Sequence, residues 1–79
     1  MPPDHPTDVV LNAMQVTVPD KLVTYEQILA LLSDYDPNYL YRVSYERAVG
    51  PETSGTLVAG QTVKVHKGTI FHATPTDKS

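Results

Sequence analysis

The sequence predicts an α+β domain in which a mixed sheet of four to five strands packs against one helix. Three observations predict this class. Short segments rich in valine and tyrosine alternate with turn residues, which is typical of strands. One segment carries the signals of a capped amphipathic helix. A chain of 79 residues with 41% hydrophobic content has room for one small core, and therefore for one domain.

The N-terminal region is expected to hold a leader and a hairpin. Residues 1–7 are rich in proline and have nothing to bury, so we assign them to a disordered leader before a domain that spans residues 8–74. The next segment, VVLNAMQVTV, indicates two short strands. Asn12 and Ala13 lie between them and predict a tight turn, because asparagine tolerates the positive φ that such turns demand.

The helix is predicted from the segment VTYEQILALLSDY. Thr24 is suited to the N-cap, and Gln27 three residues later completes a capping box. An apolar stripe at helical spacing faces the sheet and consists of Ile28, Leu31 and Leu32. The helix is expected to end before Pro37, whose ring does not fit a continuing helix.

Three more strands are expected after the helix. In YLYRVSYERAV, one face carries Tyr39, Tyr41, Val43 and Tyr45, and the other carries Arg42, Ser44 and Glu46. The segment GPETSG is interpreted as a loop. The fourth strand spans Gln61–Lys67, and the fifth spans Thr69–Thr74.

The resulting order, β-β-α-β-β-β, favours a β-grasp fold in which the helix makes the crossover and the last strand returns beside the first. A ferredoxin-like fold would need a second helix, and a small barrel would not use a capped helix of this length. The predicted core consists of Ile28, Leu31, Leu32, Tyr41, Val43, Val63, Val65 and Phe71.

Composition argues against several classes of protein. Six basic and nine acidic residues give a formal net charge of −3 and form no runs, so a nucleic-acid interface is not expected. The chain has no cysteine, which is compatible with the cytosol. The longest aliphatic run, Ile28–Leu32, is far shorter than the roughly 20 residues of a membrane span. We therefore expect a soluble, cytoplasmic protein without membrane contact.

The sequence offers no constellation that favours an enzyme, a metal site or a cofactor. GPETSG lacks the Gly-Lys-Ser/Thr end of a phosphate-binding loop. His66 and His72 lie on neighbouring predicted strands, but no cysteine and no adjacent carboxylate completes a metal shell. Two solvent-facing histidines are the favoured interpretation. We expect a protein that is not an enzyme and that has no cofactor.

One surface is a candidate for partner binding. If Phe71 points inward, the neighbouring side chains of Ile70 and His72 point outward, onto the polar face of the predicted sheet. The candidate face consists of Arg42, Lys64, Ile70 and His72. The alternative is an ordinary solvated sheet surface, because a single exposed isoleucine is common.

The C-terminus is expected to form a flexible tail over residues 75–79. Pro75 has no amide hydrogen, so strand pairing is predicted to stop there. Five extended residues at up to about 3.3 Å each would reach roughly 16 Å. Fraying of a chain end is the alternative interpretation.

Several segments resemble the bacterial multiubiquitin family of ubiquitin-like β-grasp domains. They are TYEQILALL, YRVSYERAVGPETSGTLVAGQTVKVHKGTIF and the closing ATPTDKS. The resemblance extends from about Val9 to Ser79 and continues through the tail. Family members often carry tandem copies, whereas this chain holds one. It also ends in Asp77-Lys78-Ser79 rather than in the Gly-Gly of eukaryotic modifiers.

The resemblance implies a protein modifier whose C-terminal carboxylate is activated and joined to target proteins. The implied conjugation tail consists of Thr76, Asp77, Lys78 and Ser79. The implied partners are an activating-enzyme-like protein, a conjugating-enzyme-like protein, an isopeptidase or processing protease, and the targets. The implied setting is a bacterial gene cluster of antiviral defence. The alternative is an adaptor that binds a partner enzyme non-covalently through the sheet face.

Overall fold

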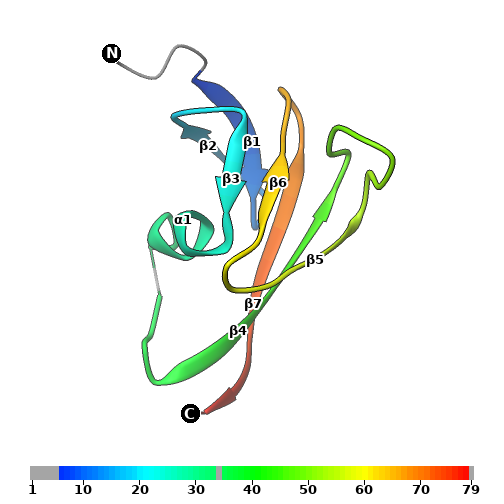
Figure 1. The fold of residues 1–79 in the computed structure, drawn as a ribbon. Coiled ribbons are helices and arrows are strands. Elements are labelled where there is room, and N and C mark those ends of the chain that lie inside the picture. Colours follow the sequence, from blue (N-terminus) through cyan, green and yellow to red (C-terminus); the bar gives the residue numbers. More distant parts are fainter. Residues whose placement is uncertain (1–5, 34, 79) are drawn as a thin grey trace.

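The structure of the chain, a computed structural model, describes residues 6–33 and 35–78. In chain order, its elements are β1 (Thr7–Leu11), β2 (Met14–Val18), β3 (Leu22–Thr24), α1 (Tyr25–Ala30), β4 (Tyr39–Glu46), β5 (Gly55–Leu57), β6 (Thr62–Lys64) and β7 (Ile70–Lys78). Five strands form one mixed sheet in the order β2-β1-β7-β4-β5, and β3 pairs with β6 in a separate ribbon (Figure 1). The architecture is the predicted ubiquitin-like β-grasp.

The first two strands form the predicted hairpin. β1 and β2 pair antiparallel, with Leu11 opposite Met14 at the turn. The turn residues Asn12 and Ala13 have φ values of 51° and 68°, both in the left-handed region that a two-residue hairpin of this type requires. The hairpin starts at Thr7, the last residue of the expected leader, and this residue is buried. Residues 1–5 of the expected leader lie outside the described residues.

The last strand lies at the centre of the sheet. β7 pairs in parallel with β1 through Val10–Ile70 and Leu11–Phe71, and antiparallel with β4 on its other side. The return of the last strand beside the first is therefore confirmed. Two short strands were not predicted: β3 precedes the helix, and β5 starts at Gly55, the last residue of the expected loop.

The helix begins as predicted and ends early. The Thr24 hydroxyl accepts a hydrogen bond from the backbone amide of Gln27, and the Gln27 side chain accepts one from the amide of Thr24, so the capping box is confirmed. However, α1 ends at Ala30, because the amides of Leu31 and Leu32 bond three residues back and tighten the last turn. The predicted helix beyond Ala30 is wrong.

The core lies between one face of the five-stranded sheet and the layer formed by α1 and the β3–β6 ribbon. Its buried apolar residues are Val9, Leu11, Val18, Val23, Ile28, Val43, Ala48, Leu57, Val63, Val65, Phe71 and Ala73. Three predicted core residues were misplaced: Leu31 is 36% exposed, Tyr41 is half-buried, and Leu32 only packs against the core. Among the described residues, no helix is long and apolar enough to cross a membrane.

Candidate functional site

The C-terminal half of β7 and the outward face of the sheet form the candidate site. The predicted conjugation tail belongs to this strand, since Thr76, Asp77 and Lys78 lie in β7, and Ser79 lies outside the described residues. The outward face contains Ile70 and His72 from β7 and Arg42 from β4.

β7 continues past Pro75, so the predicted end of strand pairing at this proline is wrong. Tyr41 lies opposite Pro75, and after an irregularity in the register Tyr39 lies opposite Lys78. The direction of the backbone groups explains why the proline is tolerated. The Ala73 amide donates to Asn12 and so points away from β4. Backbone groups two residues apart point to the same side of a strand, so the nitrogen of Pro75 also points away from β4. The missing N–H therefore falls outside the β4–β7 ladder.

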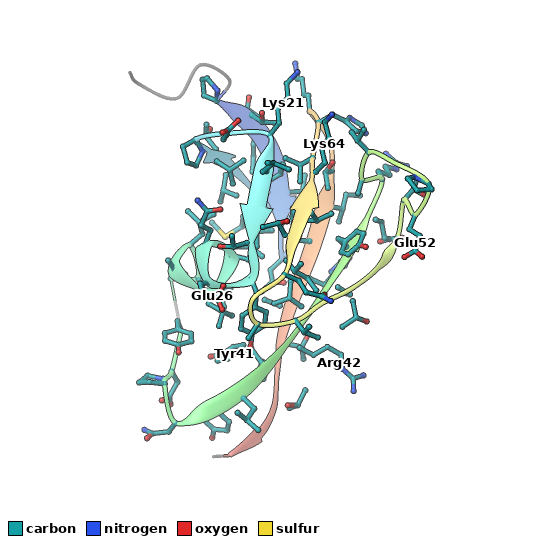
Figure 2. All side chains as sticks on the ribbon, in the orientation of Figure 1. Lys21, Glu26, Tyr41, Arg42, Glu52 and Lys64 are labelled. Carbon is teal, nitrogen blue, oxygen red and sulfur yellow. The ribbon has the colours of Figure 1, made fainter. Side chains whose placement is uncertain are left out.

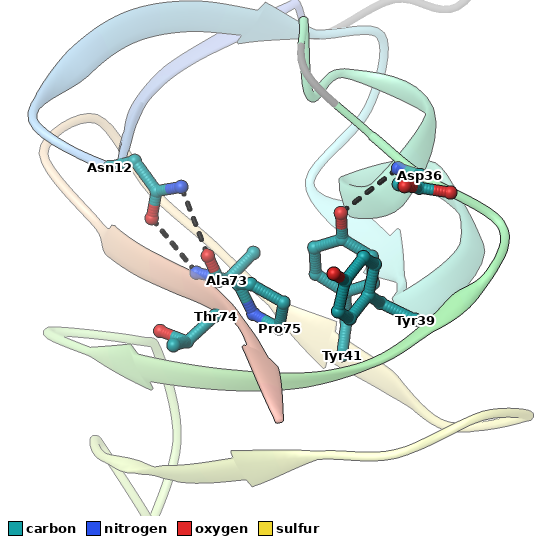
Figure 3. Close-up of a pocket in the computed structure, with 7 residues that line it drawn as sticks. All are labelled: Asn12, Asp36, Tyr39, Tyr41, Ala73, Thr74 and Pro75. Carbon is teal, nitrogen blue, oxygen red and sulfur yellow. Dashed lines mark hydrogen bonds between the residues drawn. The ribbon is translucent and has the colours of Figure 1, made fainter. Parts of the chain in front are cut away.

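Asn12 extends the pairing of β7 beyond the end of β1. Its side-chain amide donates from Nδ2 to the Ala73 carbonyl oxygen at 3.0 Å, and its Oδ1 accepts from the Ala73 amide at 2.9 Å (Figure 3). The Asn12 backbone amide also donates to the Phe71 carbonyl at 3.0 Å. A single turn residue thus takes the place of a strand beside Ala73. Asn12 was predicted only as a turn residue, because the sequence carries no local signal for its contact with Ala73.

Past Asn12, the tail is held on one side only. The Thr76 hydroxyl donates to the Leu40 carbonyl at 3.1 Å, which ties the strand to β4. On the other side, pairing with β1 ends at Leu11–Phe71. A cavity of about 420 Å³ borders Pro75. Its lining residues are Asn12, Asp36, Tyr39, Tyr41, Ala73, Thr74 and Pro75 (Figure 3). The tail strand is therefore open to solvent along one edge.

Tyr41 organises the wall of this cavity. Its hydroxyl accepts a hydrogen bond from the Asp36 amide at 2.9 Å, and its carbonyl accepts one from the Tyr25 hydroxyl at 3.0 Å. Its ring contacts the ring of Tyr35 with centroids 5.3 Å apart. These contacts hold the chain after α1 against β4, which places the wall beside the tail.

The outward face unites three of the four predicted partner-binding residues. Ile70, His72 and Thr74 alternate along β7 and lie opposite Glu46, Ser44 and Arg42 of β4, respectively. His72 Nε2 lies 3.4 Å from the Glu46 carboxylate, and both side chains are more than half exposed. The pair is too solvated to contribute much to stability. The face therefore combines the positive charge of Arg42 and the negative charge of Glu46 with the half-buried side chain of Ile70.

Lys64 does not belong to this face. It lies in β6, which pairs with β3 and not with the five-stranded sheet. Figure 2 places Lys64 towards Lys21 and away from Arg42. Lys64 was predicted to lie on the outward face because all strands were assigned to one sheet, and this placement is wrong.

The two histidines lie in different surroundings. His66 follows β6, and its Nδ1 lies 2.8 Å from the Lys67 carbonyl, whereas His72 faces Glu46. Within residues 6–33 and 35–78, no three side chains of histidine, aspartate or glutamate are placed to hold a metal ion. Every buried side-chain nitrogen or oxygen of these residues has a hydrogen-bond partner.

Comparison with known proteins identifies one relationship. A family model described as Multiubiquitin matches residues 7–77, which is nearly the whole chain and includes most of the tail. Neither a curated protein nor a solved structure matches the chain.

Proposed function

Because this chain belongs to the multiubiquitin family, we propose that it is a ubiquitin-like protein modifier whose C-terminal carboxylate is activated and joined to target proteins. The observation that carries this proposal is the extent of the family match, which runs to residue 77 and so includes the tail. Domains of this family are small and typically lack enzymatic activity. The chain is therefore proposed to be a substrate of the conjugating proteins and not a catalyst.

The geometry of β7 supports this role. The strand is anchored in the middle of the sheet, where Phe71 is fully buried, and its last residues run out along one side of β4. A partner can approach the unpaired edge beyond Ala73 without disturbing the core. The linked residue is proposed to be Ser79, or a residue exposed by trimming within Thr76–Lys78.

The partners and setting are part of the same proposal. They are an activating-enzyme-like protein, a conjugating-enzyme-like protein, an isopeptidase or processing protease, and target proteins, acting in the cytoplasm of a bacterium. A gene cluster of antiviral defence is the proposed context. Family membership supports these assignments.

Intact mass measurement tests the conjugation. The full chain is incubated with its activating and conjugating proteins, ATP and a cell extract, beside a chain that lacks residues 76–79 and so lacks every proposed linkage residue. We expect adducts of the full chain and none of the truncated chain. Absence of any adduct with the full chain would contradict the proposal, as would equal conjugation of the truncated chain.

A second candidate function is a non-covalent adaptor that uses the outward face. The observation that favours it is the grouping of Arg42, Ile70 and His72 on one sheet surface. Ile70→Glu is expected to weaken binding to the activating-enzyme-like protein while the fold persists, because this side chain faces away from the core. Lys64→Glu, on the separate ribbon, is the matched control. Equal binding by both variants and the parent would argue against the adaptor.

A further inference from the structure

The outer edge of β2 carries backbone groups that are directed away from the molecule. The amide of Val10 in β1 and that of Asn12 directly after it donate to the carbonyls of residues 69 and 71, so the even-numbered backbone groups of β1 face β7. The odd-numbered groups of β1 therefore face β2 and bond to Met14, Val16 and Val18. The N–H and C=O groups of Gln15 and Thr17 point the other way. The sheet order places no described strand on that side.

This edge lacks the features that commonly protect an edge strand. β2 reads MQVTV and contains no charge and no proline, and its register with β1 is regular over all five residues. The other edges differ. On β7 the Asn12 side chain occupies the backbone groups of Ala73, and Pro75 leaves the edge beyond it without an N–H at that position, whereas β5 has only three residues. β2 is thus the described edge best suited to accept another strand.

We infer that β2 pairs antiparallel with β2 of a second copy of this chain. The strand is self-complementary about Val16: a two-fold axis at this residue places Gln15 opposite Thr17 of the second copy, and Thr17 opposite its Gln15. Each such pair exchanges two hydrogen bonds. The four resulting bonds use every outward N–H and C=O group of Gln15 and Thr17 in both copies. A second copy also matches β2 in length and in its alternation of apolar and polar side chains, which favours it over an unrelated strand.

The side chains of β2 fit the same arrangement. Met14, Val16 and Val18 point to the core side of the sheet, and Met14 is 63% exposed. The two-fold axis places Val16 opposite its own copy and Met14 opposite Val18, which forms one continuous apolar row. Gln15 and Thr17 make the opposite face polar. No charged residue of β2 meets a like charge across the axis.

A groove of about 320 Å³ adjoins this row. It lies between the end of the hairpin and the chain after α1, and its lining includes Met14, Val16, Leu31 and Leu32. Because α1 has only six residues, it leaves this part of the sheet uncovered. The second copy would border the groove and reduce the exposure of its apolar rim.

The size of the interface predicts a weak dimer. A stable complex buries roughly 1,200–2,000 Å², and one five-residue strand from each copy provides less. We therefore expect dimers in the high-micromolar to millimolar range of concentration. Such an affinity makes the contact effective where copies are held close together, because a high local concentration favours weak pairing.

Sedimentation equilibrium of the full chain from about 50 µM to about 2 mM tests the inference. The average mass is expected to rise above 8.7 kDa towards twice that value. Concentration-dependent amide shifts in NMR spectra are expected to cluster at residues 14–18. A chain that stays monomeric at the highest concentration would overturn the inference. Shifts that cluster on another surface would also overturn it.

Two variants at the edge and one control complete the test. Gln15→Pro removes an outward N–H, and Gln15→Lys adds the charge typical of a protected edge. Each is expected to weaken dimerisation at least tenfold while circular dichroism shows the parental fold. Thr74→Lys adds the same charge at an exposed position of β7 and is expected to dimerise like the parent. If Gln15→Pro does not fold, the dimerisation of Gln15→Lys compared with that of the parent decides the test. Unchanged dimerisation of a folded Gln15 variant would overturn the inference.

Discussion

The contact between Asn12 and Ala73 is the feature of this fold whose energetic role can be tested most directly. Asn12→Gly removes both side-chain hydrogen bonds to the β7 backbone. Glycine also adopts the positive φ of 51° without strain, so the turn itself is preserved. The substitution therefore separates the bonds to Ala73 from the geometry of the hairpin.

The expected loss of stability follows from the number and surroundings of these bonds. A typical intramolecular hydrogen bond contributes about 0.5–1.5 kcal/mol. Both bonds are only partly buried, so water replaces them in part, and we expect a combined loss of about 1–2 kcal/mol. For a domain of this size, each kcal/mol lowers the melting temperature by about 4–8 °C. A loss of about 1–2 kcal/mol is a large fraction of the free energy of unfolding of a small domain.

Urea unfolding followed by circular dichroism measures this loss. Ala13→Gly is the matched control, because it adds a glycine to the same turn at a φ of 68° and removes no side-chain hydrogen bond. We expect this control to be neutral or stabilising, since an alanine at positive φ is strained. Hydrogen exchange adds a local measurement: the Ala73 amide is expected to exchange faster in Asn12→Gly. A free energy of unfolding and an Ala73 exchange rate equal to those of the parent would refute the reasoning.

Three further predictions concern the core, the helix cap and the tail strand. Ile28→Ala is expected to cost about 2–5 kcal/mol in thermal unfolding, whereas Leu31→Ala should cost less than about 1 kcal/mol because Leu31 is 36% exposed; equal losses would contradict the assigned helix face. Thr24→Ala removes the capping box and should cost about 0.5–2 kcal/mol in urea unfolding, and no measurable loss would count against its role. Pro75→Ala should cost less than about 1 kcal/mol, because alanine gives the unfolded chain more conformational freedom than proline does. Thr74→Pro removes an N–H that faces β4 and should cost about 1–3 kcal/mol in the same assay; the reverse ranking would show that the direction of the strand was misassigned.

Features that depend on neighbouring residues were predicted from the sequence. The hairpin follows from an asparagine between two valine-rich segments, and the helix start follows from Thr24 and Gln27. The inward position of Val43 follows from strict alternation along its strand. In each case, the deciding contact lies within a few residues along the chain. Local sequence therefore carries enough information to specify these elements and their buried faces.

Features that depend on distant residues were predicted less well. α1 ends early, and Tyr35 and Asp36 instead contact Tyr41 on β4. β3 and β6 have only three residues each and pair with one another across the chain. No periodic pattern appears in so short a strand. Lys64 was assigned to the outward face because no local signal shows that its strand pairs with β3 and not with the five-stranded sheet.

In the candidate site, too, features that depend on neighbouring residues were predicted and features that depend on distant residues were not. The alternation in the last strand was sufficient to place Ile70 and His72 on the outward face and Phe71 in the core. It did not reveal that Asn12 would bond to Ala73, 61 residues away along the chain, or that Pro75 would be tolerated within the strand. A proline is accepted or rejected according to which side of a strand has a neighbour, and the neighbours of β7 are chosen by the packing of the whole sheet. Local sequence thus specified the hairpin, the start of the helix and the buried faces of the longer strands, whereas tertiary structure decided the pairing of the short strands and the extent of β7, because these depend on hydrogen bonds between distant segments.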